Sequence, residues 1–406
     1  MLKTTAVNLG ASATVIIGVL LPLMMVPASK SSPLFLGIAA VLSGLAWGLS
    51  AGPAGFQAAA GKLAPSFTST TTLSALGLIV LMGASVVWAH NPASSANQFL
   101  QFLVPLLSGL ALAAFLPAIA MRKRALMWVL AVMLAALAMI IDLRTGLKLR
   151  ELTGGRATDY SYNRAMVTLC VIVWPLLALL VVRKQLHLSV LLLPLPLAVW
   201  AGASGAAGLA LLVGVLVFPI ARYFPAFSHA AGLGAMLVVI AISPFFGTLS
   251  KLVLGKAFHK ALEGAHSSDR VDIWLSFEAV AQQKWLFGNG FGSTLNLQNA
   301  AVAKNIPPEL VTLLGASHPH NAFLQLWVEL GLVGAAFAAA LTIVMFRAVG
   351  RASPVLRPFL LTWIAVVAGV SLVSHGAWQA WWIAAIAASA VGFVMLEYEM
   401  KHDVAV

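Results

Sequence analysis

Residues 162–182 read YNRAMVTLCVIVWPLLALLVV and hold a single charged side chain, Arg164. A transmembrane helix needs about 20 mostly apolar residues, so this stretch is long and apolar enough to cross a bilayer. Backbone groups in lipid must be hydrogen-bonded internally, and the alternation of a barrel strand is missing, so the stretch predicts a helix. Eleven further runs of this kind flank it, at about 8–28, 33–52, 71–90, 98–120, 124–141, 188–203, 205–221, 229–249, 320–346, 356–375 and 377–397.

The composition agrees with a membrane protein. Of the 406 residues, 61% are hydrophobic and only 9% are charged, whereas a soluble domain carries roughly 25% charged residues. This excludes a soluble enzyme, a disordered protein and a secreted disulfide scaffold. The lone Cys170 also excludes disulfides and cysteine metal clusters. We therefore expect an all-α polytopic membrane protein with about twelve transmembrane helices.

Lysine and arginine in the short loops predict the orientation of the chain. With twelve spans both termini share one side, and the short loops and ends on that side hold twelve cations, whereas the opposite short loops hold only Lys30. By the positive-inside rule both termini are expected to be cytoplasmic. We expect three parts: residues 1–249 with the first nine helices, a large outer loop at 250–319, and residues 320–406 with three helices and a short tail.

Two outer segments carry nearly half of all the cations in the chain. Their excess contributes to the net charge of +12, which comes from 24 Lys and Arg against 12 Asp and Glu. Residues 142–164 hold Arg144, Lys148, Arg150, Arg156 and Arg164, and residues 250–319 hold Lys251, Lys256, Lys260, Arg270, Lys284 and Lys304. Arginines beside the bilayer surface favour an anionic ligand held by planar guanidinium groups. Exemption of long loops from the orientation rule is the alternative for the second segment.

The long outer loop contains an expected amphipathic helix at about 270–286. Ser268 and Asp269 offer an N-cap, and apolar residues recur at helical spacing after them. Arg270 lies on the apolar stripe, four residues before Trp274, where a cation opposes the helix dipole. The sequence GNGFG at 288–292 then predicts a C-cap and turn. A phosphate-binding loop is disfavoured there because the Lys-Ser/Thr pair and a preceding strand are both missing.

The sequence SHPHNAFLQLWVELG at 317–331 marks the entry of the next span. His320 and Asn321 are expected in the first helical turn, where the helix dipole attracts anions and favours a neutral imidazole. A neutral histidine beside bound phosphate is suited to general-base catalysis. Zinc is the disfavoured rival, because His318 and His320 do not share a helical face and other ligand motifs are missing.

Three tryptophans cluster in the last outer turn, SHGAWQAWW at 374–382. An aromatic belt at the membrane interface is the plain interpretation. A stacking wall for sugar rings, or a guide for a lipid chain, is the alternative. Glu329 is the main candidate for an intramembrane acid, or it caps a polar pocket behind His320, and the sequence leaves both uses open.

The order of these motifs resembles the O-antigen ligases, within the superfamily of O-antigen ligases and polymerases. The resemblance rests on RVDIW at 270–274, FGNGFG at 287–292, HNAFL at 320–324, ELGLVG at 329–334 and YNR at 162–164. Its core covers roughly residues 265–335, and the hydropathy pattern extends it to the whole chain. Residues 293–315 match nothing in the family pattern.

The resemblance implies a metal-independent, GT-C-like glycosyltransferase of the bacterial inner membrane, with its active site on the periplasmic side. Such enzymes transfer O-antigen glycan from undecaprenyl pyrophosphate to lipid A–core, and no cofactor or nucleic acid is implied. His320 would be the general base, and Arg164 and Arg270 would bind the pyrophosphate and assist catalysis. Arg144, Lys148, Arg150, Arg156 and Asn321 are weaker candidates for the same anion, the basic ones from the charge count.

Other functions remain open from the sequence alone. An O-antigen polymerase would use the same donor with a lipid-linked acceptor, and a protein O-oligosaccharyltransferase would modify a protein. A flippase or transporter of lipid-linked glycans belongs to a different class. Transporters tend to show internal repeats and charges at the bilayer midplane, whereas these charges gather at one surface.

Overall fold

The structure is a computed structural model. It describes residues 2–66, 70–115, 124–154, 158, 160–255 and 267–401. The predicted site residue Arg156 lies outside the described residues.

Helices are the only regular secondary structure in these ranges. The α-helices are α1 (Leu2–Val15), α2 (Leu21–Met24), α3 (Ser32–Ser66), α4 (Thr70–Ser85), α5 (Pro92–Phe115), α6 (Ala125–Arg144), α7 (Lys148–Leu152), α8 (Asn163–Val182), α9 (Pro194–Ala201), α10 (Gly205–Tyr223), α11 (Pro225–Ile242), α12 (Phe246–Val253), α14 (Ser267–Gln283), α15 (Pro308–Val311), α16 (Ala322–Arg351), α17 (Arg357–Val373) and α18 (Ala380–Lys401).

The prediction of an all-α polytopic membrane protein is confirmed. Nine helical stretches in the described residues are long and apolar enough to cross a membrane. Three shorter apolar helices, Leu73–Trp88, Leu186–Ala201 and Arg357–Val373, lie where the sequence predicted three further spans. The number of helices that cross the bilayer stays a prediction.

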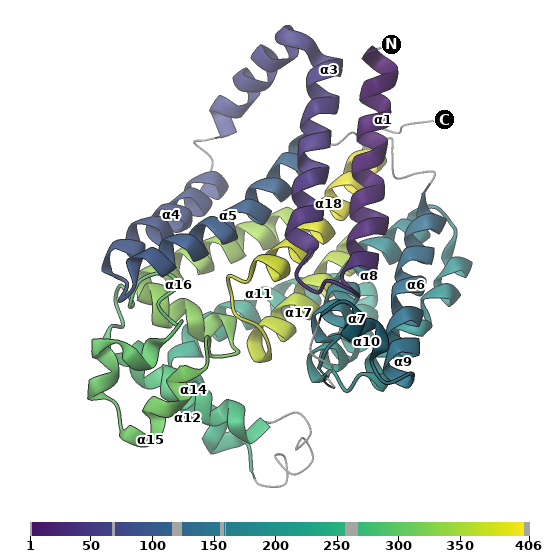
Figure 1. The fold of residues 1–406 in the computed structure, drawn as a ribbon. Helices are drawn as coiled ribbons and strands as arrows, with labels where there is room; N and C mark the ends of the chain where they lie inside the picture. Colours follow the sequence, from purple (N-terminus) through teal and green to yellow (C-terminus); the bar gives the residue numbers. More distant parts are fainter. Residues whose placement is uncertain are drawn as a thin grey trace.

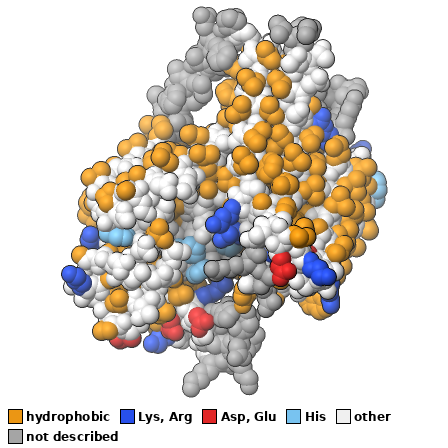
Figure 2. Space-filling model, in the orientation of Figure 1, with side chains coloured by type: hydrophobic (Ala, Val, Ile, Leu, Met, Phe, Trp, Pro, Cys, Tyr) orange, Lys and Arg blue, Asp and Glu red, His pale blue; other side chains and the backbone are white. Residues whose placement is uncertain are grey.

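The long helices place the two ends of the molecule in different surroundings. Both termini lie at one end, and α12, α14 and α15 lie at the other (Figure 1). Hydrophobic side chains cover much of the body between them, while most of the charged and histidine side chains seen on this face gather in its lower half (Figure 2). This arrangement agrees with the predicted orientation, in which both termini share one side.

Two clusters of buried apolar side chains hold the helices together. The larger one centres on α8, most of whose residues are buried, and includes residues of α1, α6, α17 and α18. The smaller one joins α14, residues 291–314 and the first turns of α16 to α4 and α5. Trp274 and Phe277 of α14 are buried in it, so the predicted apolar stripe packs on protein. The outer segment is thereby fixed against the helix that His320 precedes.

α16 is interrupted at Gly331, which the sequence did not predict. Gly331 has φ of 62°, and a Cβ atom on it would lie 2.6 Å from the backbone of Leu286. The glycine loop, residues 288–292, and the three residues before Gly288 fill this break. The Asn289 and Gly290 N–H groups donate to carbonyls of α16 at 2.9 Å each. In return two N–H groups of α16, just past Gly331, donate to carbonyls at 285 and 286, at 2.8 and 3.2 Å.

These backbone bonds explain why α14 ends at Gln283, three residues before the predicted end. A longer helix would direct the N–H groups of Asn289 and Gly290 to the carbonyls of Trp285 and Leu286, but these N–H groups donate to α16 instead. Gly288 has φ of 66°, as the predicted turn requires, and its N–H donates to the carbonyl of Lys284 at 2.9 Å.

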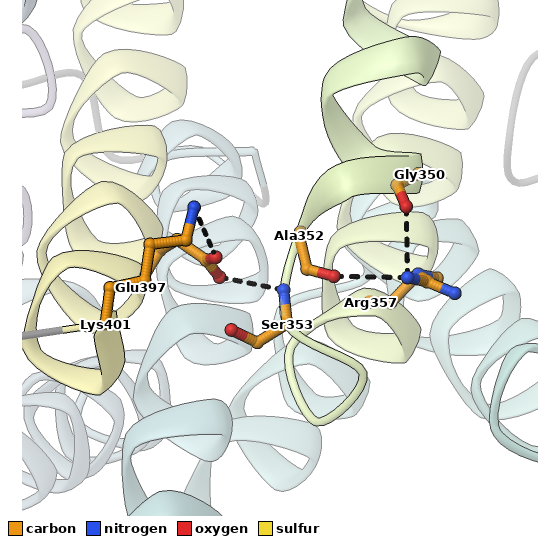
Figure 3. A network of polar contacts seen from close by, with 6 residues as sticks. All are labelled: Gly350, Ala352, Ser353, Arg357, Glu397 and Lys401. Carbon is orange, nitrogen blue, oxygen red and sulfur yellow. Dashed lines mark hydrogen bonds and ion pairs between the residues drawn. The ribbon is translucent and has the colours of Figure 1, made fainter.

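A polar network joins α16, α17 and α18 at the end of the molecule that carries both termini (Figure 3). Glu397 accepts a hydrogen bond from the Ser353 N–H at 3.0 Å and pairs with Lys401 at 3.0 Å. Arg357 donates from Nη2 to two carbonyls at the end of α16, at 3.0 and 3.2 Å. The three helices are thus fixed to one another at this end, and their opposite ends form the candidate site.

Candidate active site

Asn321 and His320 begin the site at the start of α16. Asn321 is the N-cap, and its Oδ1 accepts hydrogen bonds from the N–H groups of Phe323 and Leu324 at 3.0 Å each. The sequence predicted His320 in the first helical turn. This prediction is wrong, because His320 precedes the N-cap. Its φ of 53° is left-handed, a conformation that costs an L-residue roughly 1–2 kcal/mol. Asn321 keeps its buried Nδ2 without a partner among the described residues.

The ring of His320 is held by the loop between α17 and α18. His320 Nδ1 lies 2.7 Å from the carbonyl oxygen of Ser374. A carbonyl only accepts, so Nδ1 carries the hydrogen and Nε2 carries the lone pair of the neutral ring. Burial lowers the pKa of His320 below 6.5, the Ser374 hydrogen bond opposes this, and the charge of Arg270 lowers it further. His320 thus has the protonation state that a general base needs at neutral pH.

Two more histidines adjoin His320. His318 lies edge-to-face with His320, with ring centroids 4.3 Å apart, and its Nδ1 accepts the His320 backbone N–H at 3.3 Å. Burial, with the charges of His320 and Arg164, lowers the pKa of His318 to about 3. Burial and the charges of these neighbours lower the pKa of His375 to about 3 as well. Sequence reasoning missed His375, and its only local signal was a histidine within an otherwise apolar outer turn.

Arg164 and Arg270 reach this histidine cluster from two different helices. Arg164 is the second residue of α8 and Arg270 lies in the first turn of α14, and both are partly buried. The charge of Arg270 acts on His320 and His375, and that of Arg164 on His318 and His375. Burial also lowers the pKa of Arg270. Within the described part of the chain, no carboxylate lies within ion-pair distance of either arginine.

Two of the three tryptophans at 374–382 lie at the start of α18 and differ from the expected aromatic belt. Trp381 and Trp382 are buried, whereas a belt would present its rings to the membrane interface. The Arg164 guanidinium lies 5.8 Å from the centre of the Trp381 ring, and the His375 ring lies 4.7 Å from it. The Trp381 ring therefore supports the Arg164 guanidinium from inside the protein.

The first basic segment is folded around a buried carboxylate. Asp142 accepts hydrogen bonds from Tyr162 Oη at 2.5 Å and from the Leu149 N–H at 2.6 Å. Burial, with the Asp142 carboxylate, raises the pKa of Tyr162. Arg150 donates to the Pro27 carbonyl at 3.2 Å, and its charge acts on Tyr162. This fold fixes the start of α8 and therefore the position of Arg164.

The weaker arginine and lysine candidates divide into two groups. Arg150 lies near Arg164, because the two charges act on each other. Arg144 and Lys148 are exposed, and among the described residues no contact links them to the histidine cluster. Their role in anion binding stays a prediction.

An apolar groove of about 350 Å³ begins beside the site and follows the helices away from it. It lies between α10, α11, α16 and α17. Phe323 and Leu372 line the end next to His320 and Ser374, and Phe346 and Leu361 line it farther along. Leu361 and Leu372 are three turns apart on α17, so the groove is long enough to hold part of an extended hydrocarbon chain.

Comparison with known proteins supports the resemblance. Residues 188–339 match the family described as "O-Antigen ligase", a range that includes Arg270, the glycine loop and His320. A relative described as "Putative polysaccharide ligase", from Rickettsia bellii (strain RML369-C), is 26% identical over 264 residues. That match covers 61% of this chain and 60% of the relative's length. The resemblance to the O-antigen ligases is thus confirmed for the region that holds α14, the glycine loop and His320.

Proposed function

We propose that this protein is a membrane glycosyltransferase that transfers an O-antigen glycan from undecaprenyl pyrophosphate to lipid A–core. The observation that carries the proposal is the convergence of His320, Arg164 and Arg270 from three separate segments. A buried neutral imidazole supplies a base, and two arginines without a carboxylate partner in the described residues supply a site for a phosphate group. The family match and the relative's name support a ligase role.

In this mechanism the acceptor hydroxyl attacks the anomeric carbon of the donor glycan. His320 Nε2 takes the hydroxyl proton as the new glycosidic bond forms. The bond between the anomeric carbon and the pyrophosphate oxygen breaks, and undecaprenyl pyrophosphate leaves with the electron pair. Arg164 and Arg270 offset the negative charge that develops on the leaving oxygen. A single displacement of this kind inverts the configuration at the anomeric carbon.

The apolar groove supports a lipid-linked donor. Its end beside Phe323 and Leu372 adjoins the segments that carry His320 and Ser374. A pyrophosphate held by Arg164 and Arg270 would leave the prenyl chain next to this groove. The predicted inner-membrane location, cytoplasmic termini and periplasmic site belong to the same proposal, because the donor and the acceptor meet at the periplasmic surface.

The proposal is tested in proteoliposomes that contain purified protein, lipid-linked glycan and lipid A–core. We expect transfer by the wild type, loss of transfer on the order of 10³-fold or more in His320→Ala, and normal membrane insertion of that variant. A chelator should leave the rate unchanged. Full activity of His320→Ala would contradict the base assignment.

The same assay separates the acceptors. Longer lipid-linked chains without transfer to lipid A–core would indicate a polymerase. Glycan on an added protein acceptor would indicate a protein O-oligosaccharyltransferase.

A further inference from the structure

Glu329 is a fully buried carboxylate in the first part of α16, and four groups donate hydrogen bonds to it. The donors are the Gly292 N–H at 2.7 Å, Thr294 Oγ1 at 2.7 Å, Gln325 Nε2 at 2.8 Å and Trp378 Nε1 at 2.8 Å. Since amide and indole N–H groups can only donate, both carboxylate oxygens of Glu329 are acceptors. Burying a carboxylate is costly unless it is hydrogen-bonded in this way.

These donors come from three segments that are distant in sequence. Gly292 is the last residue of the glycine loop and Thr294 follows it. Gln325 lies one turn earlier on α16, and Trp378 belongs to the α17–α18 loop. Gln325 also binds that loop directly, because its Oε1 accepts the Ala377 N–H at 2.8 Å. Two adjacent residues of the α17–α18 loop, Ala377 and Trp378, are therefore hydrogen-bonded to α16.

The same loop orients His320 by two routes. Its Ser374 carbonyl lies 2.7 Å from His320 Nδ1. Its Gln379 amide nitrogen lies 2.8 Å from His318 Nε2, and the other ring nitrogen of His318 lies 3.3 Å from the His320 backbone nitrogen. A shift of the loop would therefore disturb both the ring and the left-handed backbone of His320.

We propose that Glu329 is a positioning residue, which acts through Trp378 and Gln325 to hold the α17–α18 loop so that Ser374 keeps His320 in the tautomer with Nε2 as the basic atom. The inference deepens the proposed function and rests on it, because it assigns a role to a residue that does not touch the substrate. It also resolves the two uses that the sequence left open for Glu329, in favour of the polar network behind His320.

Trp378→Phe tests the link, because it removes the indole N–H that binds Glu329 and keeps a smaller aromatic ring at the position. Trp327→Phe is the matched control, since it removes a buried indole N–H of α16 that donates to the Ile240 carbonyl at 2.7 Å and points away from the loop. We expect Trp378→Phe to lower kcat about 10-fold with KM for the donor unchanged. Trp327→Phe should keep kcat within about twofold.

Glu329→Gln is the stronger change, because an amide cannot accept from all four donors. Its control is Glu278→Gln, which alters another buried carboxylate that accepts from Thr248 at 2.5 and 3.0 Å and from Gln282 at 3.3 Å. We expect Glu329→Gln to lower kcat more than Trp378→Phe does, and Glu278→Gln to keep it. If Glu329→Gln fails to fold, Trp378→Phe still decides the question.

A readout that is independent of transfer separates this inference from the proposed function. Diethyl pyrocarbonate modifies only the neutral form of a histidine ring. The modification rate of His320, followed by mass spectrometry across pH, therefore reports the pKa of His320. Losing the Ser374 hydrogen bond removes an effect that raises this pKa, so the titration should move to lower pH in Trp378→Phe and Glu329→Gln. The other charged and titratable groups that act at the cluster, Arg164, Arg270, His318 and His375, are unchanged in both variants.

The inference is supported if the His320 titration shifts in Trp378→Phe and Glu329→Gln and does not shift in Trp327→Phe or Glu278→Gln. This result does not depend on the identity of the glycan acceptor. An unshifted titration overturns it, even if kcat falls, because a merely structural defect would lower kcat alone. An active His320→Ala protein would instead overturn the proposed function.

Discussion

The charged side chains at the two ends of α16, α17 and α18 differ in whether they have partners within the protein. At the end near the termini, Glu397 pairs with Lys401, Arg183 pairs with Glu399, and Arg357 binds backbone carbonyls. At the opposite end, Arg164 and Arg270 lie beside three histidines, with no carboxylate at ion-pair distance in the described ranges. Charges that are already satisfied stabilise a helix end. Cations that are gathered without an anion leave their electrostatic energy for a ligand, which is what a pyrophosphate site requires.

The largest difference between the ends should appear when one arginine at each is replaced by lysine. Arg270→Lys keeps the charge but removes the guanidinium fork. Loss of one charge-assisted hydrogen bond, worth about 1.5–3 kcal/mol, would lower kcat/KM for glycan transfer about 10- to 150-fold. Arg357→Lys should stay within about twofold, because it contacts only carbonyls far from the site. Equal losses in the two variants would remove the distinction between the ends.

Acid should destabilise the protein through the histidine end. The unfolded chain binds a proton on His318 and His375 below pH 6.5, whereas the folded protein does so only near a pKa of about 3. Stability is therefore greatest above pH 6.5 and falls as the pH drops toward 3, by up to about 1.4 kcal/mol per pH unit for each group. Thermal unfolding in detergent between pH 6.5 and 5 measures this slope. His375→Gln should flatten it, because one of the two histidines is then missing.

The smallest effect is expected for Glu397→Gln. The pair with Lys401 is partly exposed, with 60% of the Lys401 side chain accessible, and such pairs contribute about 0.3–0.5 kcal/mol. The glutamine oxygen can still accept the Ser353 N–H. We expect unchanged transfer and a Tm lowered by about 2 °C or less. A loss of transfer in this variant would show that the two ends are coupled.

Much of the helical architecture could be predicted from the sequence, because each apolar run is a local signal. The region of the site was also predictable, since Arg164, Arg270 and His320 are marked by charge placement and motif. The break at Gly331 was not, because its hydrogen-bonding partners at 285–290 lie about 40 residues away. The burial of Trp381 was missed for a similar reason: the same residue type suits a lipid interface and a cation-supporting interior.

The contribution of His375 shows a further limit of the sequence. Its place beside His320 depends on how α17 and α18 pack against α8 and α16, and no spacing along the chain encodes that packing. The same holds for Glu329, whose donors come from three segments. Residues that act through long-range hydrogen bonds become visible only once the chain is folded.

The break in α16 also makes this helix depend on a segment that is synthesised before it. In the folded protein residues 285–290 pair with two carbonyls and two N–H groups around Gly331, and each such group left unpaired in an apolar environment would cost several kcal/mol. The docking segment is made first, so it is already present when the ribosome completes α16. Closure of this junction therefore links the native form of α16 to correct folding of the segment before it.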